Sequence, residues 1–192
     1  MNQDQRKALR KAKIAARDGL TAEEREQFSK LIVSRILESA VVHSAETVMI
    51  YRGIRGEVRL DGLEDAGTAA GKRVVYPLCI SKTEMIALLP EGGDAWQEGY
   101  CGILEPILEK SEVIPPEEID LVICPCTVFD ERCGRMGMGA GFYDRYLERC
   151  VNARAVSVAF EVQKTELIPM ESWDKPMELV FTEAAVYQAA EK

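Results

Sequence analysis

Glycines are dense between residues 134 and 141, where the sequence reads GRMGMGAG. A glycine lacks a Cβ atom, so the backbone can approach a ligand closely and its N–H groups can donate to it. Arg135 adds a cation, and Asp144 falls in the first turn of a helix expected to start near Phe142. The dipole of such a helix favours an anion, and a carboxylate beside a phosphate suits Mg²⁺. These residues together predict a phosphate-binding loop with a magnesium ligand.

The loop matches neither of the two common glycine-rich nucleotide signatures. Gly134 and Gly139 have the spacing of a Walker A loop, but no Lys-Ser/Thr pair follows them. Counted from Gly137, the Rossmann pattern G-x-G-x-x-G also fails, because Phe142 stands at its last position. A tight strand-to-helix turn is the alternative explanation, and it accounts for one glycine more readily than for four in eight residues. Phosphate binding is therefore the favoured interpretation.

A second cationic element lies at the start of the chain. The 192 residues carry a formal net charge of −8, with 24 Lys and Arg against 32 Asp and Glu. Residues 1–17 hold six basic side chains and one acidic side chain, a net charge of +5, so the rest carries −13. Arg6, Arg10, Lys13 and Arg17 are spaced to share one face of a helix. A solvated face is the ordinary explanation of a charge run, but the contrast in sign favours an anionic partner.

Two further carboxylates stand in expected loops. Glu57 lies in GIRGEVR, and Asp174 lies between Trp173 and Lys175-Pro176. A single carboxylate in a loop is usually solvated, so the residues around each one do not by themselves indicate a role.

Composition excludes several classes of protein. The chain has no run of 18 apolar residues, so we expect no membrane span, and its acidic balance disfavours nucleic acid as a partner. The first residues contain no apolar signal core, so we expect a cytoplasmic protein. Six cysteines form no C-x-x-C pair and accompany a single histidine, His43, which argues against a zinc site and favours reduced thiols.

Helices and buried strands alternate along the chain and must position these residues. Helices are predicted over residues 3–18, 22–39, 60–70 and 143–150. Strands are predicted over 47–51, 73–78, 85–89, 121–124 and 155–160, with edge strands over 179–181 and 184–187. The acidic, turn-rich stretch 90–118 is interpreted as a long loop or a linker. The alternation predicts one α/β domain over 1–192, a three-layer α/β/α, Rossmann-like fold around a largely parallel sheet with mixed edges.

The glycine loop and its flanks resemble the signature of a known family. FDERCGRMGMGAGFYDRYL is similar to F-D-x-x-G-x-R-L-G-x-G-x-G-Y-Y-D-x-Y-L of the 5-formyltetrahydrofolate cyclo-ligase family. The resemblance extends over nearly the whole chain. Its other segments are RKALRKAKIAARDGLTAEER at the start, then GKRVVYPLC, GILEP and EEIDLVICP in the expected order, and IPMESWDKPMELVFTE near the end.

The resemblance implies an enzyme that uses ATP and Mg²⁺ to convert 5-formyltetrahydrofolate to 5,10-methenyltetrahydrofolate, releasing ADP and phosphate. In the family mechanism the formyl oxygen attacks the γ-phosphate of ATP, and N10 then closes the ring as phosphate leaves. Phosphorylation turns a poor leaving group into a good one, so such a protein mainly aligns donor and acceptor and neutralises charge. The implied partner is a small-molecule folate, and we expect a monomer.

Carried over by position, the resemblance also implies roles for individual residues. Arg135 and Tyr143 would be catalytic. Asp144 and Asp174 would hold Mg²⁺, and Glu57 and Phe142 would bind the folate. Contacts to ATP would come from the first helix and the glycine loop, through Arg6, Lys7, Arg10, Arg135, Gly137, Met138, Gly139, Ala140, Gly141, Phe142 and Tyr143.

Departures from the family pattern leave two other functions open. Phe142 replaces the first Tyr of Tyr-Tyr-Asp, Trp173 replaces a His, and the segment around Glu57 lacks the usual flanking residues. Because the folate-side residues diverge, one alternative is an ATP- and magnesium-dependent phosphotransfer enzyme that acts on another acceptor. Because Phe142 lacks a hydroxyl, the other alternative is a folate- or nucleotide-binding protein without turnover.

Overall fold

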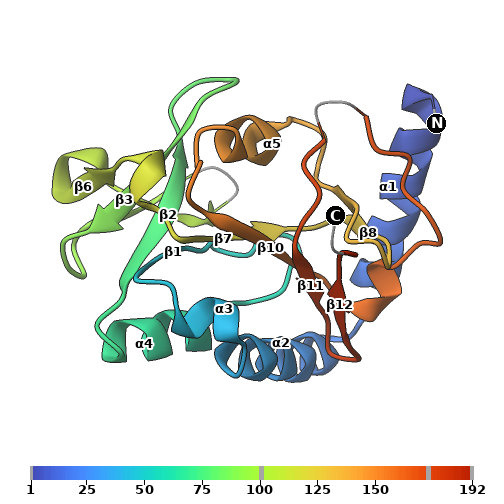
Figure 1. The fold of residues 1–192 in the computed structure, drawn as a ribbon, viewed down its shortest axis with the longest axis horizontal. Helices are drawn as coiled ribbons and strands as arrows, with labels where there is room; N and C mark the ends of the chain where they lie inside the picture. The colour runs from blue at the N-terminus through green and yellow to red at the C-terminus, as the bar shows by residue number, and fades with distance from the viewer. Residues whose placement is uncertain (1, 100–101, 172–173, 191–192) are drawn as a thin grey trace.

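An eight-stranded mixed sheet forms the centre of the protein in a computed structural model that describes residues 2–99, 102–171 and 174–190 (Figure 1). In order across the sheet the strands are β12 (Val186–Gln188), β11 (Leu179–Phe181), β10 (Arg154–Val158), β7 (Leu121–Pro125), β1 (Thr47–Met49), β2 (Arg73–Cys79), β3 (Met85–Pro90) and β6 (Ser111–Ile114). The run from β11 to β2 is parallel throughout. Antiparallel pairs add β12 at one edge and β3 with β6 at the other. This confirms the predicted α/β fold with a largely parallel sheet and mixed edges.

Both faces of the sheet are buried, because successive residues of its central strands are apolar and point to opposite sides. Ile50 and Ile123 belong to the core on the face covered by helices α2, α3 and α4. Met49 and Val122 belong to the core on the other face, which α5 covers. The helices are α1 (Gln3–Asp18), α2 (Ala22–Leu37), α3 (Ala40–His43), α4 (Asp61–Ala69) and α5 (Phe142–Leu147). Helices on both faces of the sheet give the predicted three layers.

Capping residues set the ends of the first helices. The Asn2 side chain accepts from the Gln5 N–H at 2.9 Å, and the Thr21 hydroxyl accepts from the Glu24 N–H at 3.1 Å. Both contacts belong to capping boxes, which start α1 and α2 where the sequence predicts. The second helix is shorter than predicted, because Ser39 caps a separate helix, α3. None of the described helices is both long and apolar enough to cross a membrane.

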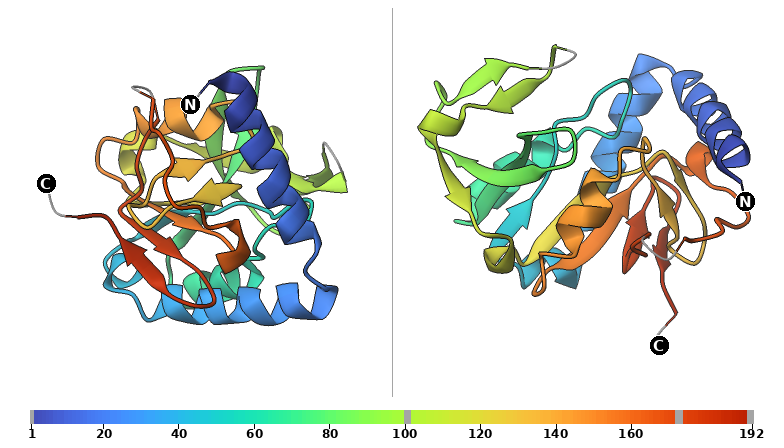
Figure 2. Two further views of the ribbon diagram at one scale, coloured as in Figure 1. Left: turned by 90° about the vertical axis from the view of Figure 1, so that its right-hand side faces the viewer. Right: turned by 90° about the horizontal axis from the view of Figure 1, so that it is seen from above.

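Helix α1 covers neither face of the sheet but packs at one end of the molecule (Figures 1 and 2). There it contacts the 3₁₀ turn η4 (Glu161–Gln163) and strand β8 (Val128–Phe129). The chain reaches η4 from the carboxyl end of β10 and reaches β8 from the carboxyl end of β7. The basic helix therefore lies beside the carboxyl ends of the parallel strands, where ligands bind in open α/β sheets.

The prediction of a loop or linker over 90–118 is wrong. This stretch forms the hairpin β4 (Trp96–Glu98) and β5 (Leu104–Pro106), the short turns η2 (Leu108–Lys110) and η3 (Pro116–Glu118), and the edge strand β6. The hairpin is anchored by Trp96, whose ring meets Tyr76 of β2 edge-on with centroids 4.8 Å apart. Of the two strands predicted at an edge near the C-terminus, only β12 lies there, because β11 pairs with strands on both sides.

The described cysteines carry free thiols. Cys124, Cys126, Cys133 and Cys150 are buried, as expected of small apolar groups in a core, whereas Cys79 is exposed. Cys101 lies outside the described residues.

Candidate functional site

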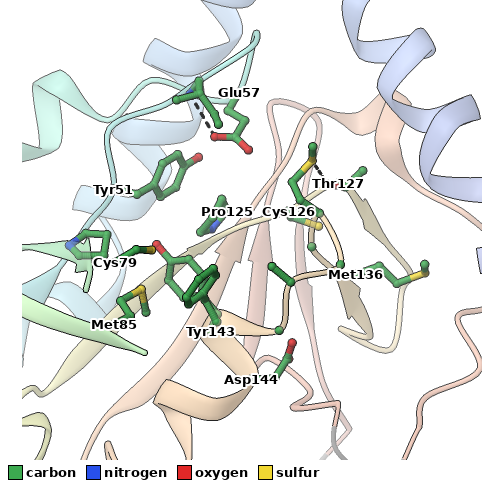
Figure 3. A pocket seen from close by; sticks show the side chains of 18 of the residues that line it. Tyr51, Glu57, Cys79, Met85, Pro125, Cys126, Thr127, Met136, Tyr143 and Asp144 are labelled. Atoms are coloured by element: carbon green, nitrogen blue, oxygen red, sulfur yellow. Dashed lines mark hydrogen bonds between the residues drawn. The ribbon is translucent and has the colours of Figure 1, made fainter. Parts of the chain in front are cut away.

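A cavity of about 380 Å³ opens at the carboxyl ends of the parallel strands, between α1, the glycine loop and the segment after β1 (Figure 3). The predicted site residues that line it are Arg6, Arg10, Glu57, Arg135, Gly137, Met138, Gly139, Ala140, Gly141, Phe142, Tyr143, Asp144 and Asp174. Lys7 does not line it, because the Lys7 side chain is exposed on another side of α1. Residues predicted from four separate segments thus meet in one cavity of a size that suits a small ligand.

Helix α1 brings two arginines to this cavity. Arg6 is 5% exposed, and its Nη2 donates to the Asp174 carboxylate at 2.9 Å and 3.2 Å. Arg10 donates from Nε to the Gly137 carbonyl at 2.9 Å. Burial lowers the pKa of Arg10, and repulsion from Arg6 lowers it further. An anion bound between the two guanidinium groups would relieve that repulsion.

The rest of the basic face of α1 also contacts protein. Lys13 donates from Nζ to the carbonyls of Val162, at 3.3 Å, and Lys164. Arg17 is 1% exposed and donates from Nη2 to the Arg55 carbonyl at 2.8 Å. The basic face of α1 therefore packs against protein and is not a solvated face, which is the ordinary explanation of a charge run.

Asp130 fixes the entry to the glycine loop. Its Oδ1 accepts from the backbone N–H of Arg132 at 3.0 Å and of Gly134 at 2.9 Å, and its Oδ2 accepts from Ile168 N–H at 2.7 Å. These bonds close the hairpin between β8 and β9 (Arg135–Met136) and tie it to the chain before Asp174. Asp130 has no role among the residues predicted from the sequence, although it is the Asp of the FDER segment that carries the resemblance.

The glycine loop combines the two explanations considered for it. Gly139 and Gly141 adopt φ angles of 105° and 69°, so the chain does make turns that favour glycine. The loop also lines the cavity from Gly137 onward. The helix that follows is shorter than predicted, with six residues ending at Leu147, so its dipole is small. Positive charge at this end of the cavity comes mainly from arginine side chains.

Arg135 is the cation at the centre of the site. Its side chain is 2% exposed, and Nη2 donates to Asp144 Oδ1 at 2.7 Å while Nη1 donates to the Pro125 carbonyl at 3.3 Å. Its Nε has no hydrogen-bond partner among the described residues, and its Cζ lies 5.9 Å from the Tyr143 ring centroid. A buried guanidinium with a donor to spare suits a bound anion. Burial raises the pKa of Tyr143 well above its usual value, so its hydroxyl stays protonated and can donate.

Asp144 and Asp174 lie on neighbouring segments, because the Lys175 N–H donates to Asp144 Oδ1 at 3.5 Å. Each carboxylate already pairs with a guanidinium, Arg135 for Asp144 and Arg6 for Asp174. Within the described ranges, no group of three His, Cys, Asp or Glu side chains is placed to hold a metal. Mg²⁺ commonly takes only one or two carboxylates and completes its shell with phosphate oxygens and water, so this pair fits it. Trp173 lies outside the described residues.

Glu57 and Tyr51 lie at the end of the cavity away from Asp144, with Tyr143 between the two ends (Figure 3). The Glu57 side chain is 8% exposed, and its Oε2 accepts from the Ile54 N–H at 3.1 Å. Burial raises the pKa of Glu57, and the Ile54 hydrogen bond and the Arg17 charge oppose that rise. A carboxylate in such a place can accept paired N–H donors from a ligand.

Apolar side chains line the cavity between its two charged ends. Cys79 and Met85, from β2 and β3, face Pro125 and Cys126 at the end of β7. These residues and Tyr51 were not predicted from the sequence, because each is an ordinary strand or loop residue with no local motif. Only the order of the strands in the sheet brings them together.

Known proteins resemble this chain over nearly its whole length. A model of the 5-formyltetrahydrofolate cyclo-ligase family matches residues 2–183. The 5-formyltetrahydrofolate cyclo-ligase of Escherichia coli (strain K12) is 31% identical over 176 residues, which cover 90% of this chain and 97% of that protein. The Haemophilus influenzae protein of the same name is 30% identical over 183 residues, with 92% and 97% covered.

Two solved structures share the fold. The structure of Aquifex aeolicus 5,10-methenyltetrahydrofolate synthetase matches with a TM-score of 0.84 and 30% identity, over 97% of this chain and 93% of that one. The Mycoplasma pneumoniae synthetase matches with a TM-score of 0.76 over 92% and 98%, and at 24% identity it supports the fold alone.

Proposed function

The chain belongs to the 5-formyltetrahydrofolate cyclo-ligase family, and from that premise we propose that it converts 5-formyltetrahydrofolate to 5,10-methenyltetrahydrofolate with ATP and Mg²⁺. The observation that supports this best is the division of one cavity into two ends. Arginines and the glycine loop line one end, and the buried carboxylate of Glu57 lines the other. Such a cavity suits a triphosphate and a folate ring held side by side.

At the phosphate end, Arg6 and Arg10 hold the triphosphate against the backbone of the loop from Gly137 to Gly141. Arg135 neutralises the charge that develops on the γ-phosphoryl group during transfer, because its buried fork lies in the wall of the cavity. Asp144 and Asp174 hold Mg²⁺, which when bound adds positive charge beside the phosphate oxygens.

At the folate end, Glu57 accepts N–H donors of the pterin, and this contact fixes the ring. The hydroxyl of Tyr143, kept protonated by burial, orients the formyl oxygen toward the γ-phosphate. Phe142 lines the cavity with the Arg145 guanidinium 5.5 Å from its ring centroid, so it packs against a cation and offers no hydroxyl. Tyr143 therefore supplies the hydroxyl that this segment brings to the reacting groups.

The chemistry has two steps. The formyl oxygen attacks the γ-phosphorus, and the bond from that phosphorus to the β–γ bridging oxygen breaks, so ADP leaves. N10 of the folate then attacks the formyl carbon, loses its proton, and expels phosphate, which carries the former formyl oxygen. The protein contributes alignment of the oxygen with the γ-phosphate and neutralisation of charge, the two terms that dominate phosphoryl transfer.

A turnover assay tests the proposal. The purified protein is mixed with 5-formyltetrahydrofolate, ATP and Mg²⁺, and the product is followed by its near-ultraviolet absorbance. We expect product only when all three are present, together with one ADP per product. A folded sample that forms no product but releases ADP with another acceptor would favour a different phosphotransfer reaction. Calorimetric binding of ATP or folate without any turnover would favour a binding protein.

A further inference from the structure

Arg17, in the last turn of α1, is a buried cation that does not line the cavity. Its side chain is 1% exposed, and its hydrogen bond runs from Nη2 to the Arg55 carbonyl at 2.8 Å. Its Nε and Nη1 have no hydrogen-bond partner among the described residues. Nη1 lies 3.9 Å from Glu57 Oε1, and Nε lies 4.0 Å from Asp18, whose side chain is 58% exposed. Burying a charge is unfavourable unless a partner of opposite charge offsets the loss of hydration, and Glu57 is the buried partner.

The turn that Arg17 contacts is strained. Arg55 and Gly56 have φ angles of 47° and 78°, and the Glu57 N–H closes the turn on the Ile54 carbonyl at 2.9 Å. The left-handed region is unfavourable for a non-glycine residue, because its Cβ comes too close to the following carbonyl oxygen. The carbonyl that Arg17 holds is that of the strained residue, Arg55. Arg17 thus fixes the turn that places Glu57 at the cavity.

Arg17 also supplies charge to Glu57 from a different element. The titratable and charged groups that face Glu57 are Arg17 from α1, Arg55 from its own turn, Tyr51 from the segment after β1, Tyr143 from α5 and Cys126 from the segment after β7. Burial raises the pKa of Tyr51 and Tyr143 well above the usual value and that of Cys126 to about 12, so these three groups stay neutral near pH 7. The charge that favours an ionised Glu57 therefore comes from Arg17 and Arg55.

We propose that Arg17 is a positioning residue, which holds the turn over 54–57 and keeps Glu57 ionised so that this carboxylate can accept N–H donors at the folate end. The role of Glu57 in folate binding rests on the proposed function, whereas the effect of Arg17 on Glu57 does not. Because α1 also presents Arg6 and Arg10 to the phosphate end, one helix sets the charged groups at both ends of the cavity.

The test compares the wild-type protein with Arg17→Met, which keeps a long side chain and removes the charge. The Glu57 carboxyl is titrated in the ligand-free protein by ¹³C NMR of labelled glutamate and is assigned with Glu57→Gln. Loss of a cation about 4 Å away should raise the pKa of Glu57 by about one unit or more. In turnover, KM for 5-formyltetrahydrofolate should rise roughly tenfold while KM for ATP changes by less than about twofold.

The pH profile gives a readout that a packing defect would not move. Glu57 must be ionised to accept donors, so kcat/KM falls as the pH drops through its pKa. A further rise in that pKa should move the acid limb of the Arg17→Met profile to higher pH by the same amount. Arg17→Lys, which keeps the charge, should restore the limb in large part even where it does not restore KM.

Lys13→Met is the matched control. It removes one charge from the same face of α1, and the Lys13 ammonium contacts backbone carbonyls of the η4 segment. We expect an unchanged Glu57 titration and an unchanged folate KM. In a Glu57→Gln background, Arg17→Met should have little further effect on KM, because the group it acts through is gone.

The outcomes separate this inference from the proposed function. An unshifted Glu57 titration in Arg17→Met overturns the inference. The inference is also overturned if the fold-changes in folate KM caused by Arg17→Met and by Glu57→Gln simply multiply in the double variant. A wild-type protein without turnover overturns the proposed function, and a shifted Glu57 titration would still support the action of Arg17 on Glu57. If Arg17→Met does not fold, the same titration in Arg17→Gln decides, with a raised Glu57 pKa as the expected result and an unshifted pKa as the result that overturns the inference.

Discussion

At the scale of single residues, the site depends on guanidinium groups that are buried but not fully used by the protein. Arg135 donates one hydrogen bond to Asp144 and one to the Pro125 carbonyl, and its Nε has no hydrogen-bond partner among the described residues. Arg6 is likewise buried against Asp174. Each carboxylate offsets the cost of burying its arginine, and Arg135 retains a donor without a partner among the described residues.

Arg135→Ala should lower kcat by roughly 100-fold to 1,000-fold, the scale seen when one donor to a transition-state charge is removed. KM for folate should change much less. Arg135→Lys should recover only a small part, because an ammonium lacks the guanidinium fork that reaches Asp144 and the cavity together. Steady-state kinetics check this, with circular dichroism to show that the fold is intact. Rates like those of the wild type would contradict the assigned role.

Asp174→Asn should weaken the binding of Mg²⁺. The amide keeps the shape of the side chain but has one oxygen and no charge, so the Mg²⁺ concentration for half-maximal activity should rise roughly tenfold. Glu171→Gln is a suitable comparison, because the Glu171 carboxylate lies 3.9 Å from Arg6 and has no assigned metal contact. An Asp174→Asn magnesium titration that overlays that of the wild type would count against Asp174 as a ligand.

At the scale of elements, the glycine loop is held from several sides. Asp130 fixes its entry, Arg10 holds the Gly137 carbonyl, and Arg145 donates to the Ala140 carbonyl at 2.8 Å and to Thr83 of the β2–β3 turn at 2.9 Å. A loop anchored in this way keeps its positive-φ residues in place without a ligand. We infer that the phosphate end is largely formed before the proposed nucleotide would bind.

Gly139→Ala should impair ATP binding selectively. The φ angle of 105° strains any side chain at this position, so the loop that lines the phosphate end should be distorted, although a Cβ there would lie 3.5 Å from Arg10 Cζ, in ordinary contact. We expect KM for ATP to rise roughly tenfold with little change in folate KM. Gly93→Ala is the control, because a Cβ at that position meets no heavy atom within 4 Å. Equal ATP kinetics for the two variants would contradict this account of the loop.

Elements with strong local signals could be predicted from the sequence, and elements made by tertiary pairing could not. Residues rich in Ala, Lys and Arg predict the first helix, the capping-box pattern at Thr21 predicts the start of the second, and apolar runs predict the central strands. The strands β8 and β9 have two residues each, too few for any periodicity. The hairpin β4–β5 exists because Trp96 packs against Tyr76 of a distant strand.

Some residues of the site could be predicted from the sequence, and others are brought together only by the fold. The glycine loop and the basic helix could be recognised because their residues are close in sequence. Cys126, Met85 and Tyr51 meet only through strand order, and the partnership of Arg17 with Glu57 joins a helix to a turn 40 residues further on. Glu57 was assigned by resemblance, and its burial and charge partner emerge only in three dimensions.

At the scale of the whole molecule, the uneven charge has a structural explanation. The N-terminal residues carry +5 within a chain of net charge −8, and the structure turns their arginines inward to the cavity and to Glu57. The acidic remainder contributes Asp144 and Asp174 to the same cavity. A negative overall charge is therefore compatible with a site for an anionic substrate, because the cations are concentrated where the substrate would lie.

Stability should fall at alkaline pH. Burial raises the pKa of the Cys124 and Cys126 thiols to about 12 from an ordinary value of 9.0. Between these values the unfolded chain loses protons that the folded protein keeps, so the free energy of unfolding decreases by up to about 1.4 kcal/mol per pH unit for each thiol. Urea unfolding under reducing conditions from pH 8 to 11 measures this slope. A free energy that stays constant or rises above pH 9 would contradict the burial of these thiols.

The fate of the formyl oxygen shows whether the cavity transfers a phosphoryl group to that oxygen, as we propose. The protein is given 5-formyltetrahydrofolate labelled with ¹⁸O in the formyl group, together with ATP and Mg²⁺, and the released phosphate is analysed by mass spectrometry. We expect one ¹⁸O atom in each phosphate formed with product. Product accompanied by unlabelled phosphate would contradict the account.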